Sequence, residues 1–110
     1  METYSLESRA RGLLERAAAS SGRAAETLVG GSGRVLRQTL LALTAGTSLA
    51  EHDNPGEATL LVVKGSVRLR SGEESWEGSA GDLLTVPGAR HSLEALQDAA
   101  VLLSVARTGS

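Results

Sequence analysis

The stretch from Gly46 to Gly65, GTSLAEHDNPGEATLLVVKG, sets the pattern of the whole chain. It holds a histidine (His52), an Asn-Pro-Gly turn signal, an apolar run typical of a strand, and a closing glycine. The chain has one other histidine, His91, which ends a second turn-like passage, GDLLTVPGARH. About forty residues separate the two imidazoles, and strand-like runs flank both. An antiparallel sheet could bring them together, so the sequence predicts a site without naming its ligand.

Length and composition limit the classes of protein that the chain can represent. Its 110 residues fit one domain, residues 1–110, with enough apolar residues for a core. There is no cysteine, which excludes a disulfide framework and a thiolate zinc site and favours the cytoplasm. A net charge of −2 provides no basic surface, so we expect neither nucleic acid nor an anionic membrane as the main partner.

The first part of the chain predicts one helix. Residues 5–20, SLESRARGLLERAAAS, carry apolar residues at helical spacing, and Ser5 is placed to cap the first turn. Charges of both signs alternate on the other face, which is typical of a helix on the outside of a domain or at a subunit interface. The sequence before it lacks an apolar core, so we expect no signal peptide, and no later run has membrane-spanning length.

The rest of the chain has the sequence pattern of short strands separated by turns. Residues 23–29 precede a glycine cluster, and residues 34–44 fit either a strand buried on both faces or a helix, with the flanking turns favouring a strand. Seven further strands are predicted at about 47–51, 58–63, 66–71, 74–77, 82–86, 91–96 and 99–106. Such regular spacing predicts a β-sandwich or barrel. The last strand is apolar on both faces, so we expect it to be central or covered by a partner.

The spacing around both histidines resembles that of the cupins, small jelly-roll barrels. Their first motif, G-x5-H-x-H-x3/4-E-x6-G, matches at Gly46, His52 and Gly65. Their second, G-x5-P-x-G-x2-H-x3-N, matches at its glycine, proline and His91, with the proline-to-histidine interval one residue short. The resemblance covers about residues 40–106. It implies a mainly β fold, a double-stranded β-helix or jelly-roll barrel over about 23–106, with one short N-terminal α-helix.

The departures from these motifs concern the metal ligands. Asn54 stands where the family has its second histidine, and Ala58 stands where it has glutamate. Glu57 lies one residue early, and alternation along a strand would turn its carboxylate to the opposite face unless the preceding turn leaves it in an irregular segment. The resemblance therefore implies a ligand role for His52, His91 and, on that condition, Glu57. The implied cofactor is one divalent ion (Fe, Mn, Ni or Zn), or none.

Two classes of function follow, and the sequence leaves both open. In the first, which the missing ligands favour, the barrel is a binding module for a small molecule, a divalent metal, or both. In the second, His52, His91 and Glu57 hold a mononuclear metal for dioxygenase, isomerase or lyase chemistry. A weaker third reading is a sensor whose imidazoles respond to metal or pH. We also expect a homodimer, because strand 99–106 and helix 5–20 offer apolar surface that a small monomer leaves uncovered.

The sequence also predicts where several other side chains lie. Trp76 is one of two aromatic residues; we expect it to pack in the core, and the alternatives are a position on a sheet face or over the mouth of a pocket. Glu94 follows His91 by three residues, so alternation places it on the opposite face. Asp82 is predicted to brace its turn. Of Arg37 and Gln38, whichever points inward would be a polar group of the cavity.

Overall fold

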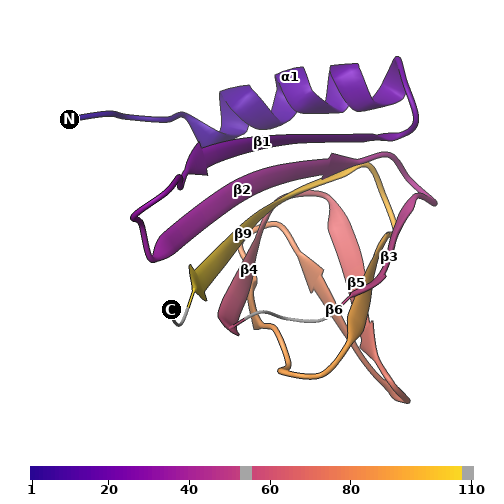
Figure 1. Ribbon diagram of the computed structural model, residues 1–110. Helices are drawn as coiled ribbons and strands as arrows, with labels where there is room; N and C mark the ends of the chain where they lie inside the picture. Colours follow the sequence, from indigo (N-terminus) through magenta and orange to yellow (C-terminus); the bar gives the residue numbers. More distant parts are fainter. Residues whose placement is uncertain (53–55, 108–110) are drawn as a thin grey trace.

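The computed structural model describes residues 1–52 and 56–107 of the protein. This part of the chain forms one helix, α1 (Leu6–Ala18), followed by strands only (Figure 1). The strands are β1 (Arg23–Val29), β2 (Leu36–Leu43), β3 (Ser48–His52), β4 (Gly56–Lys64), β5 (Ser66–Ser71), β6 (Glu74–Ser79), β7 (Leu83–Thr85), β8 (His91–Ala95) and β9 (Ala99–Arg107). The mainly β fold with one N-terminal helix is confirmed. The ambiguous segment 34–44 forms a strand, β2.

Helix α1 lies within the predicted range 5–20: it begins directly after the predicted cap, Ser5, and ends at Ala18. The Ser5 hydroxyl accepts a hydrogen bond from the Ser8 backbone N–H at 3.3 Å, which satisfies one of the free donors of the first turn. Glu7 in the first turn and Arg16 in the last both complement the helix dipole. Within the described residues, no helix is long and apolar enough to cross a membrane.

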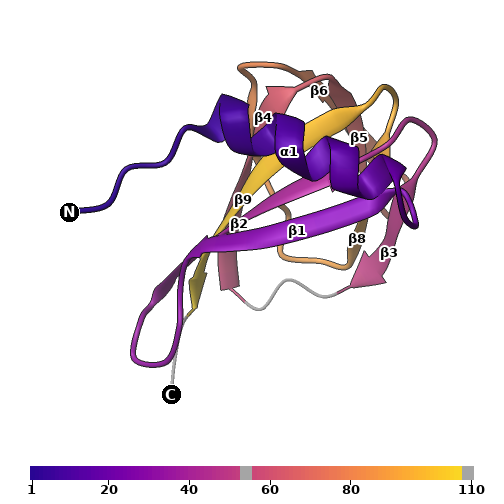
Figure 2. The ribbon, with the colours of Figure 1, turned by 90° about the horizontal axis from the view of Figure 1, so that it is seen from above.

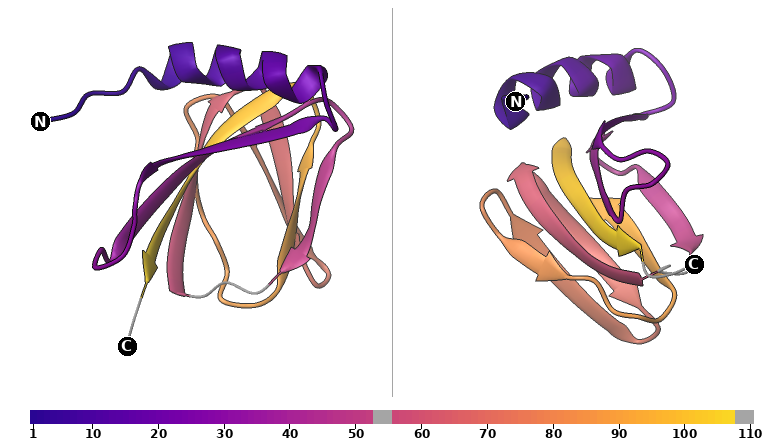
Figure 3. Two further views of the ribbon diagram at one scale, coloured as in Figure 1. Left: turned by 45° about the horizontal axis from the view of Figure 1, so that its top comes forward. Right: turned by 60° about the vertical axis from the view of Figure 1, so that its left-hand side comes forward.

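The strands form two antiparallel sheets that face each other as a jelly-roll barrel (Figures 1 and 3). The five-stranded sheet has the order β1-β2-β9-β4-β7, and the four-stranded sheet has the order β3-β8-β5-β6. Strand β9 pairs with β2 on one side and β4 on the other, so the prediction that it is central is confirmed. The chain passes from β4 in one sheet to β5 in the other through Gly65. At that point a Cβ atom would lie 2.1 Å from the Asp98 carbonyl oxygen, which only glycine avoids.

The main core lies between the two sheets. Alternate residues of β4 and β9 point into it, including Leu60, Val62 and Val101, and they meet Leu69 and Leu93 from the four-stranded sheet. Leucine, valine and alanine fill this space without aromatic rings, as the composition predicts. Close packing of these apolar side chains holds the two sheets together and sets the distance between them.

A second apolar cluster joins α1 to the outer face of the five-stranded sheet. Leu13 and Ala17 of the helix pack on Leu40 and Ala42 of β2, with Leu102 of β9 beside them. Figure 2 shows α1 lying across the five-stranded sheet. This contact explains why β9 is apolar on both faces: one side meets the barrel core, and part of the other lies beneath the helix. Helix α1 of the same chain therefore covers that part of β9.

Candidate functional site

The backbone register places the two histidines directly opposite each other. Strand β3 pairs with β8, and His52 is the Cα partner of His91. The neighbouring pair is Leu49 with Leu93, so three residues of β3 span two residues of β8 and the register shifts between the pairs. This irregularity brings His52 into line with His91 at the end of the sheet. The side chain of His52, and Asn54 as a whole, lie outside what the structure describes.

His91 is a buried polar residue on the core side of its sheet. Its exposed fraction is 5%, and it alternates with Leu93 and Ala95, which belong to the core between the sheets. The ring atom Nδ1 lies 3.1 Å from the Ala89 carbonyl oxygen. Because a carbonyl only accepts, this contact favours the tautomer with the proton on Nδ1 and the lone pair on Nε2. An imidazole held in this way can accept a proton or bind a metal through Nε2.

The chain before His91 is fixed at several points. The Ser71 hydroxyl donates to the Arg90 carbonyl oxygen at 2.8 Å, and the Val86 N–H donates to the Ala58 carbonyl oxygen at 3.0 Å. Farther back, the Asp82 carboxylate accepts from the Ser79 N–H at 2.9 Å, so the predicted brace is confirmed. The passage from one sheet to the other is thus anchored at both ends. This anchoring limits how far the His91 ring can shift.

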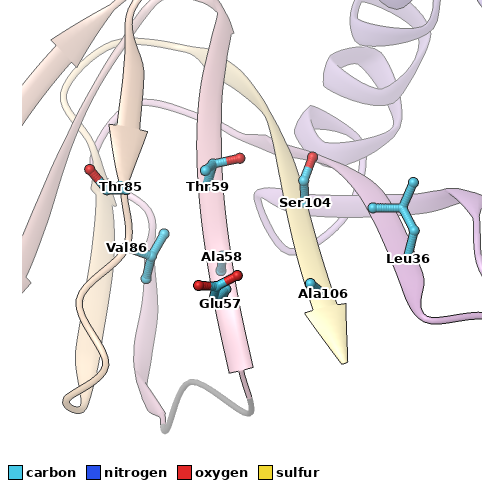
Figure 4. Close-up of a pocket in the computed structure, with 8 residues that line it drawn as sticks. All are labelled: Leu36, Glu57, Ala58, Thr59, Thr85, Val86, Ser104 and Ala106. Atoms are coloured by element: carbon cyan, nitrogen blue, oxygen red, sulfur yellow. The ribbon is translucent and has the colours of Figure 1, made fainter. Parts of the chain in front are cut away.

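Strand β4 places Glu57 and Ala58 on opposite faces. Ala58 is buried in the core between the sheets and pairs with Val105. Glu57 is exposed, pairs with Ala106, and points to the outer face (Figure 4). The regular strand already begins at Gly56, so the irregular segment that would have turned Glu57 inward is not formed at this residue. The structure therefore places Glu57 on the outer face of the five-stranded sheet, whereas His91 faces the core between the two sheets.

No metal cage is visible among the side chains that the structure describes: no three histidine, cysteine, aspartate or glutamate residues of this set lie close enough to hold an ion. Glu94 lies on the face opposite His91, as alternation predicts, and its carboxylate is 3.5 Å from Arg68. The carboxylate on the neighbouring β6 position, Glu77, pairs with the same arginine at 3.1 Å. These acidic groups belong to a charged outer surface.

Two further polar candidates are separated by the register of β2. Gln38 pairs with Ser104 on the outer face, and its Nε2 donates to the serine hydroxyl at 3.0 Å. Arg37 pairs with the core residue Val105, so it occupies the inward register position, yet its side chain is exposed. Strand β2 at this end runs beyond the opposing sheet. Of the two, Arg37 therefore occupies the inner-face position of the sheet and Gln38 the outer-face position.

The expectation that Trp76 packs in the core is wrong. Trp76 is the register partner of Leu69, which is buried, so the two share the inner face of the four-stranded sheet. The tryptophan is nevertheless 39% exposed. Strand β6 is the edge of its sheet, and the strand across from it in the other sheet, β7, has three residues, so little covers the ring. Trp76 lies at the rim of the barrel.

A groove crosses the outer face of the five-stranded sheet, away from the histidines. Its volume is about 540 Å³ (Figure 4). Its lining comes from four neighbouring strands and the residue after β7: Leu36, Glu57, Ala58, Thr59, Thr85, Val86, Ser104 and Ala106. Sequence reasoning missed this feature, because the strand pattern does not say how much of the face the helix covers. The available signal was the interruption of apolar strands by Thr59 and Ser104.

No family model matches the sequence, and no curated protein matches it. Solved structures do resemble it. A cupin superfamily protein from Desulfitobacterium hafniense superposes with a TM-score of 0.72 at 16% identity, covering 78% of each chain. The chain has the cupin fold. A conserved protein of unknown function from Streptococcus pyogenes gives a TM-score of 0.73 at 24% identity, over 83% of this chain and 79% of that one.

A larger protein shares the same cupin fold. Salicylate 1,2-dioxygenase from Pseudoaminobacter salicylatoxidans, as a mutant in complex with gentisate, gives a TM-score of 0.79 at 24% identity. The match covers 94% of the present chain and 33% of the dioxygenase chain. The present chain thus spans about a third of that enzyme. At this level of identity, the likeness concerns the fold.

Proposed function

We propose that the protein is a cupin-type binding module that holds a small molecule or a divalent metal ion inside the barrel, beside His52 and His91. The observation that carries this proposal is the direct pairing of the two histidines across β3 and β8, with His91 buried on the core side. Opposed residues of an antiparallel pair have Cβ atoms roughly 4.5–5.5 Å apart, which is close enough for two imidazoles to share one ligand.

The donor set fits a metal ion in part. Two neutral imidazoles suit Fe, Ni or Zn better than Mn, which prefers oxygen ligands, and the Nδ1 contact of His91 supports binding through Nε2. The carboxylate of a two-histidine, one-carboxylate site does not fit, because Glu57 lies on the outer face and Ala58 occupies the inward position. We therefore propose binding, with the remaining metal positions filled by solvent or by the small molecule.

The first test is metal content after purification without chelator, followed by titration with Zn²⁺ or Ni²⁺. We expect one ion per chain for the wild type and loss of uptake in both His52→Ala and His91→Ala. Glu57→Gln is the matched acidic control and should bind as the wild type does. Loss of uptake in Glu57→Gln would instead establish Glu57 as a third ligand, and a wild type that takes up no metal would remove the metal from the proposal.

A second candidate is a mononuclear metal enzyme, a dioxygenase, isomerase or lyase. The observation that favours it is the likeness to salicylate 1,2-dioxygenase, whose structure holds gentisate. The inward alanine at position 58 counts against it. Oxygen consumption by the iron-loaded wild type, tested with gentisate and salicylate, decides between the two: turnover supports the enzyme, and binding without turnover supports the module.

We further propose that the protein acts as a homodimer. Support comes from large apolar side chains that stay exposed on the five-stranded sheet, Leu36 and Leu83. Light scattering at tens of micromolar should give about twice the chain mass of 11.3 kDa. A monomer under these conditions would contradict the proposal without affecting the metal site.

A further inference from the structure

One row of residues crosses the four-stranded sheet at its histidine end. His52 pairs with His91, and the Ser71 hydroxyl donates to the backbone carbonyl just before His91 at 2.8 Å. Continuing the regular register of β5 and β8 by one residue places Ser71 alongside His91, and Ser71 pairs with Glu74 of β6. Ser71 alternates with the buried residues of β5, so its partner Glu74 takes an inner-face position. The register thus aligns Glu74 with the two histidines.

Trp76 shares the inner face of β6 with Glu74. The two residues are two positions apart, which separates them by about 7 Å along the strand. Gly78, next on this face, is buried, and a Cβ atom there would already touch core side chains at 3.4 Å. Trp76 and Glu74 are both exposed, so the packed core ends at the glycine. Figure 1 shows the turn between β5 and β6 at the same end of the barrel as the loop before β8.

The described groups along this row attract hydrogen-bond donors. His91 keeps a lone pair on Nε2, because its Nδ1 faces a backbone carbonyl. The Ser71 hydroxyl gives its proton to another carbonyl. The ion pairs among the described side chains join other residues, so the Glu74 carboxylate can meet a ligand. The face of the Trp76 ring is also electron-rich.

Basic side chains are kept away from this part of the barrel. Arg68 and Arg70 alternate with the buried residues of β5 and therefore lie on the outer face. Among the side chains that the structure describes, the inner face of the four-stranded sheet carries no lysine or arginine. Arg37 takes an inner-face position in the other sheet, but β9 and β4 separate its strand from β7, which lies opposite β6. The β6 side of the barrel therefore favours a positively charged ligand.

We propose that Trp76 and Glu74 select a small organic cation as the ligand of the barrel. A protonated primary amine lies over the tryptophan ring and donates to the Glu74 carboxylate, and the body of the molecule extends along the row toward His91. Two strand spacings of about 4.8 Å separate Glu74 from His91, so a molecule of about 10 Å spans the site. The inference rests on the proposed small-molecule role of the barrel and names the class of ligand.

The first experiment compares three probes that differ in charge alone at one end of a phenyl-ethyl body: phenethylamine, phenethyl alcohol and hydrocinnamate. Trp76 is the only tryptophan of the chain, so its fluorescence reports on this site. The dissociation constant of phenethylamine should be at least about tenfold lower than that of the other two. Equal binding of the three probes, a preference for hydrocinnamate, or no saturable response to phenethylamine would overturn the proposal.

Matched substitutions on the two faces of β6 test the role of Glu74. Glu74→Gln should reduce the affinity for phenethylamine to that for phenethyl alcohol. Glu77→Gln removes the same charge next to Trp76 in the sequence, but on the outer face, where Glu77 pairs with Arg68, and it should keep the preference. Circular dichroism reports whether each variant folds. A preference that persists in folded Glu74→Gln, or an equal loss in Glu77→Gln, would contradict the inference.

A second measurement needs no ligand. A carboxylate beside the Trp76 ring should concentrate cations there, so caesium should quench its emission more efficiently than iodide does, relative to free tryptophan at the same ionic strength. Glu74→Gln should lower this caesium-to-iodide ratio, and Glu77→Gln should change it less. A wild type quenched preferentially by iodide, or an unchanged ratio in Glu74→Gln, would show that Glu74 does not lie beside the ring and would overturn the proposal.

Metal uptake by the same wild-type samples separates this inference from the metal site proposed above. A wild type that prefers phenethylamine but takes up no metal would keep the cation inference and remove the metal from the proposed function. A wild type that takes up metal but shows no preference for phenethylamine would overturn the cation inference alone.

Discussion

The two sheets of the barrel share one core but differ in what their outer faces carry. The four-stranded sheet presents charged residues outward, with Arg68 between Glu77 and Glu94, and holds both histidines at one end of its first two strands. The five-stranded sheet presents apolar and hydroxyl residues outward, beneath and beside helix α1. The first outer face is suited to water, and the second is suited to contact with protein.

This difference separates two tasks within a small chain. Ligand chemistry is concentrated on the inner side of the four-stranded sheet, where His91 is buried and its ring is held by a backbone carbonyl. Contact with another chain is expected on the outer side of the five-stranded sheet. The two regions lie on different sheets, so a substitution in one should leave the other intact and measurable.

The largest effect is expected where the two sheets are joined. Gly65 links β4 to β5 with a positive φ of 76°, and a Cβ there would meet the Asp98 carbonyl. Gly65→Ala should lower the free energy of unfolding by about 3 kcal/mol or more, since strain and overlap add. Gly72→Ala is the control, because its φ is 60° but no atom lies within 4 Å, and it should cost about 1 kcal/mol. Equal losses in urea denaturation would contradict the account of the junction.

The two ends of the outer face of the five-stranded sheet should respond differently to the same truncation. Leu40→Ala, beneath the helix, should cost about 2–5 kcal/mol of unfolding free energy. Leu36→Ala, at the end of the strand that the helix leaves uncovered, should cost less than about 0.5 kcal/mol within one chain. Denaturation at low protein concentration measures the single-chain effect. A large cost of Leu36→Ala under these conditions would show that Leu36 is already covered within the chain.

A carboxylate on the core side should complete the metal site. Ala58 points inward, so Ala58→Glu supplies the group that Glu57 does not. We expect metal binding to tighten by at least about tenfold, or ~1.4 kcal/mol, and the metal-free protein to lose stability because the new carboxylate is buried. Thermal unfolding with and without Zn²⁺ measures both effects. Unchanged affinity in a folded variant would mean that position 58 does not face the histidines.

The smallest effect is expected on the charged outer face. Arg68→Ala removes two ion pairs with Glu77 and Glu94, but these groups are partly exposed. The loss should stay below about 1 kcal/mol and shrink as salt is added, because exposed pairs are screened. Unfolding at low and high ionic strength tests this. A loss of several kcal/mol that is insensitive to salt would assign Arg68 a structural role that its exposure does not indicate.

Much of the fold could be predicted from the sequence because it depends on local signals. Turn residues separate the strands, and the cap at Ser5 marks the start of the helix. Residue alternation also predicts the outward position of Glu94. What could not be predicted depends on the pairing of distant segments. The exposure of Trp76 follows from β6 being an edge opposite the short β7, and the groove follows from how far α1 extends over the sheet. The periodicity of a single strand predicts neither the exposure of Trp76 nor the groove.

The candidate site was predictable to the same extent. Motif spacing indicated His52 and His91, and the register shows that they are strand partners. The facing of Glu57 depended on where β4 begins, and a single residue decides it: regular pairing from Gly56 turns the next side chain outward. Sequence spacing alone leaves this choice open, because the length of a turn decides whether a one-residue difference shifts the register of the strand that follows.

The central claim is that His52 and His91 act together on one ligand. X-ray absorption at the metal edge of the Zn²⁺- or Ni²⁺-loaded protein tests it most directly, because the outer-shell scattering of imidazole rings reports how many histidines bind the ion. The account predicts two imidazoles per metal in the wild type and one or none in His52→Ala and His91→Ala. A wild-type spectrum with a single imidazole, unchanged by one of the two substitutions, would contradict it.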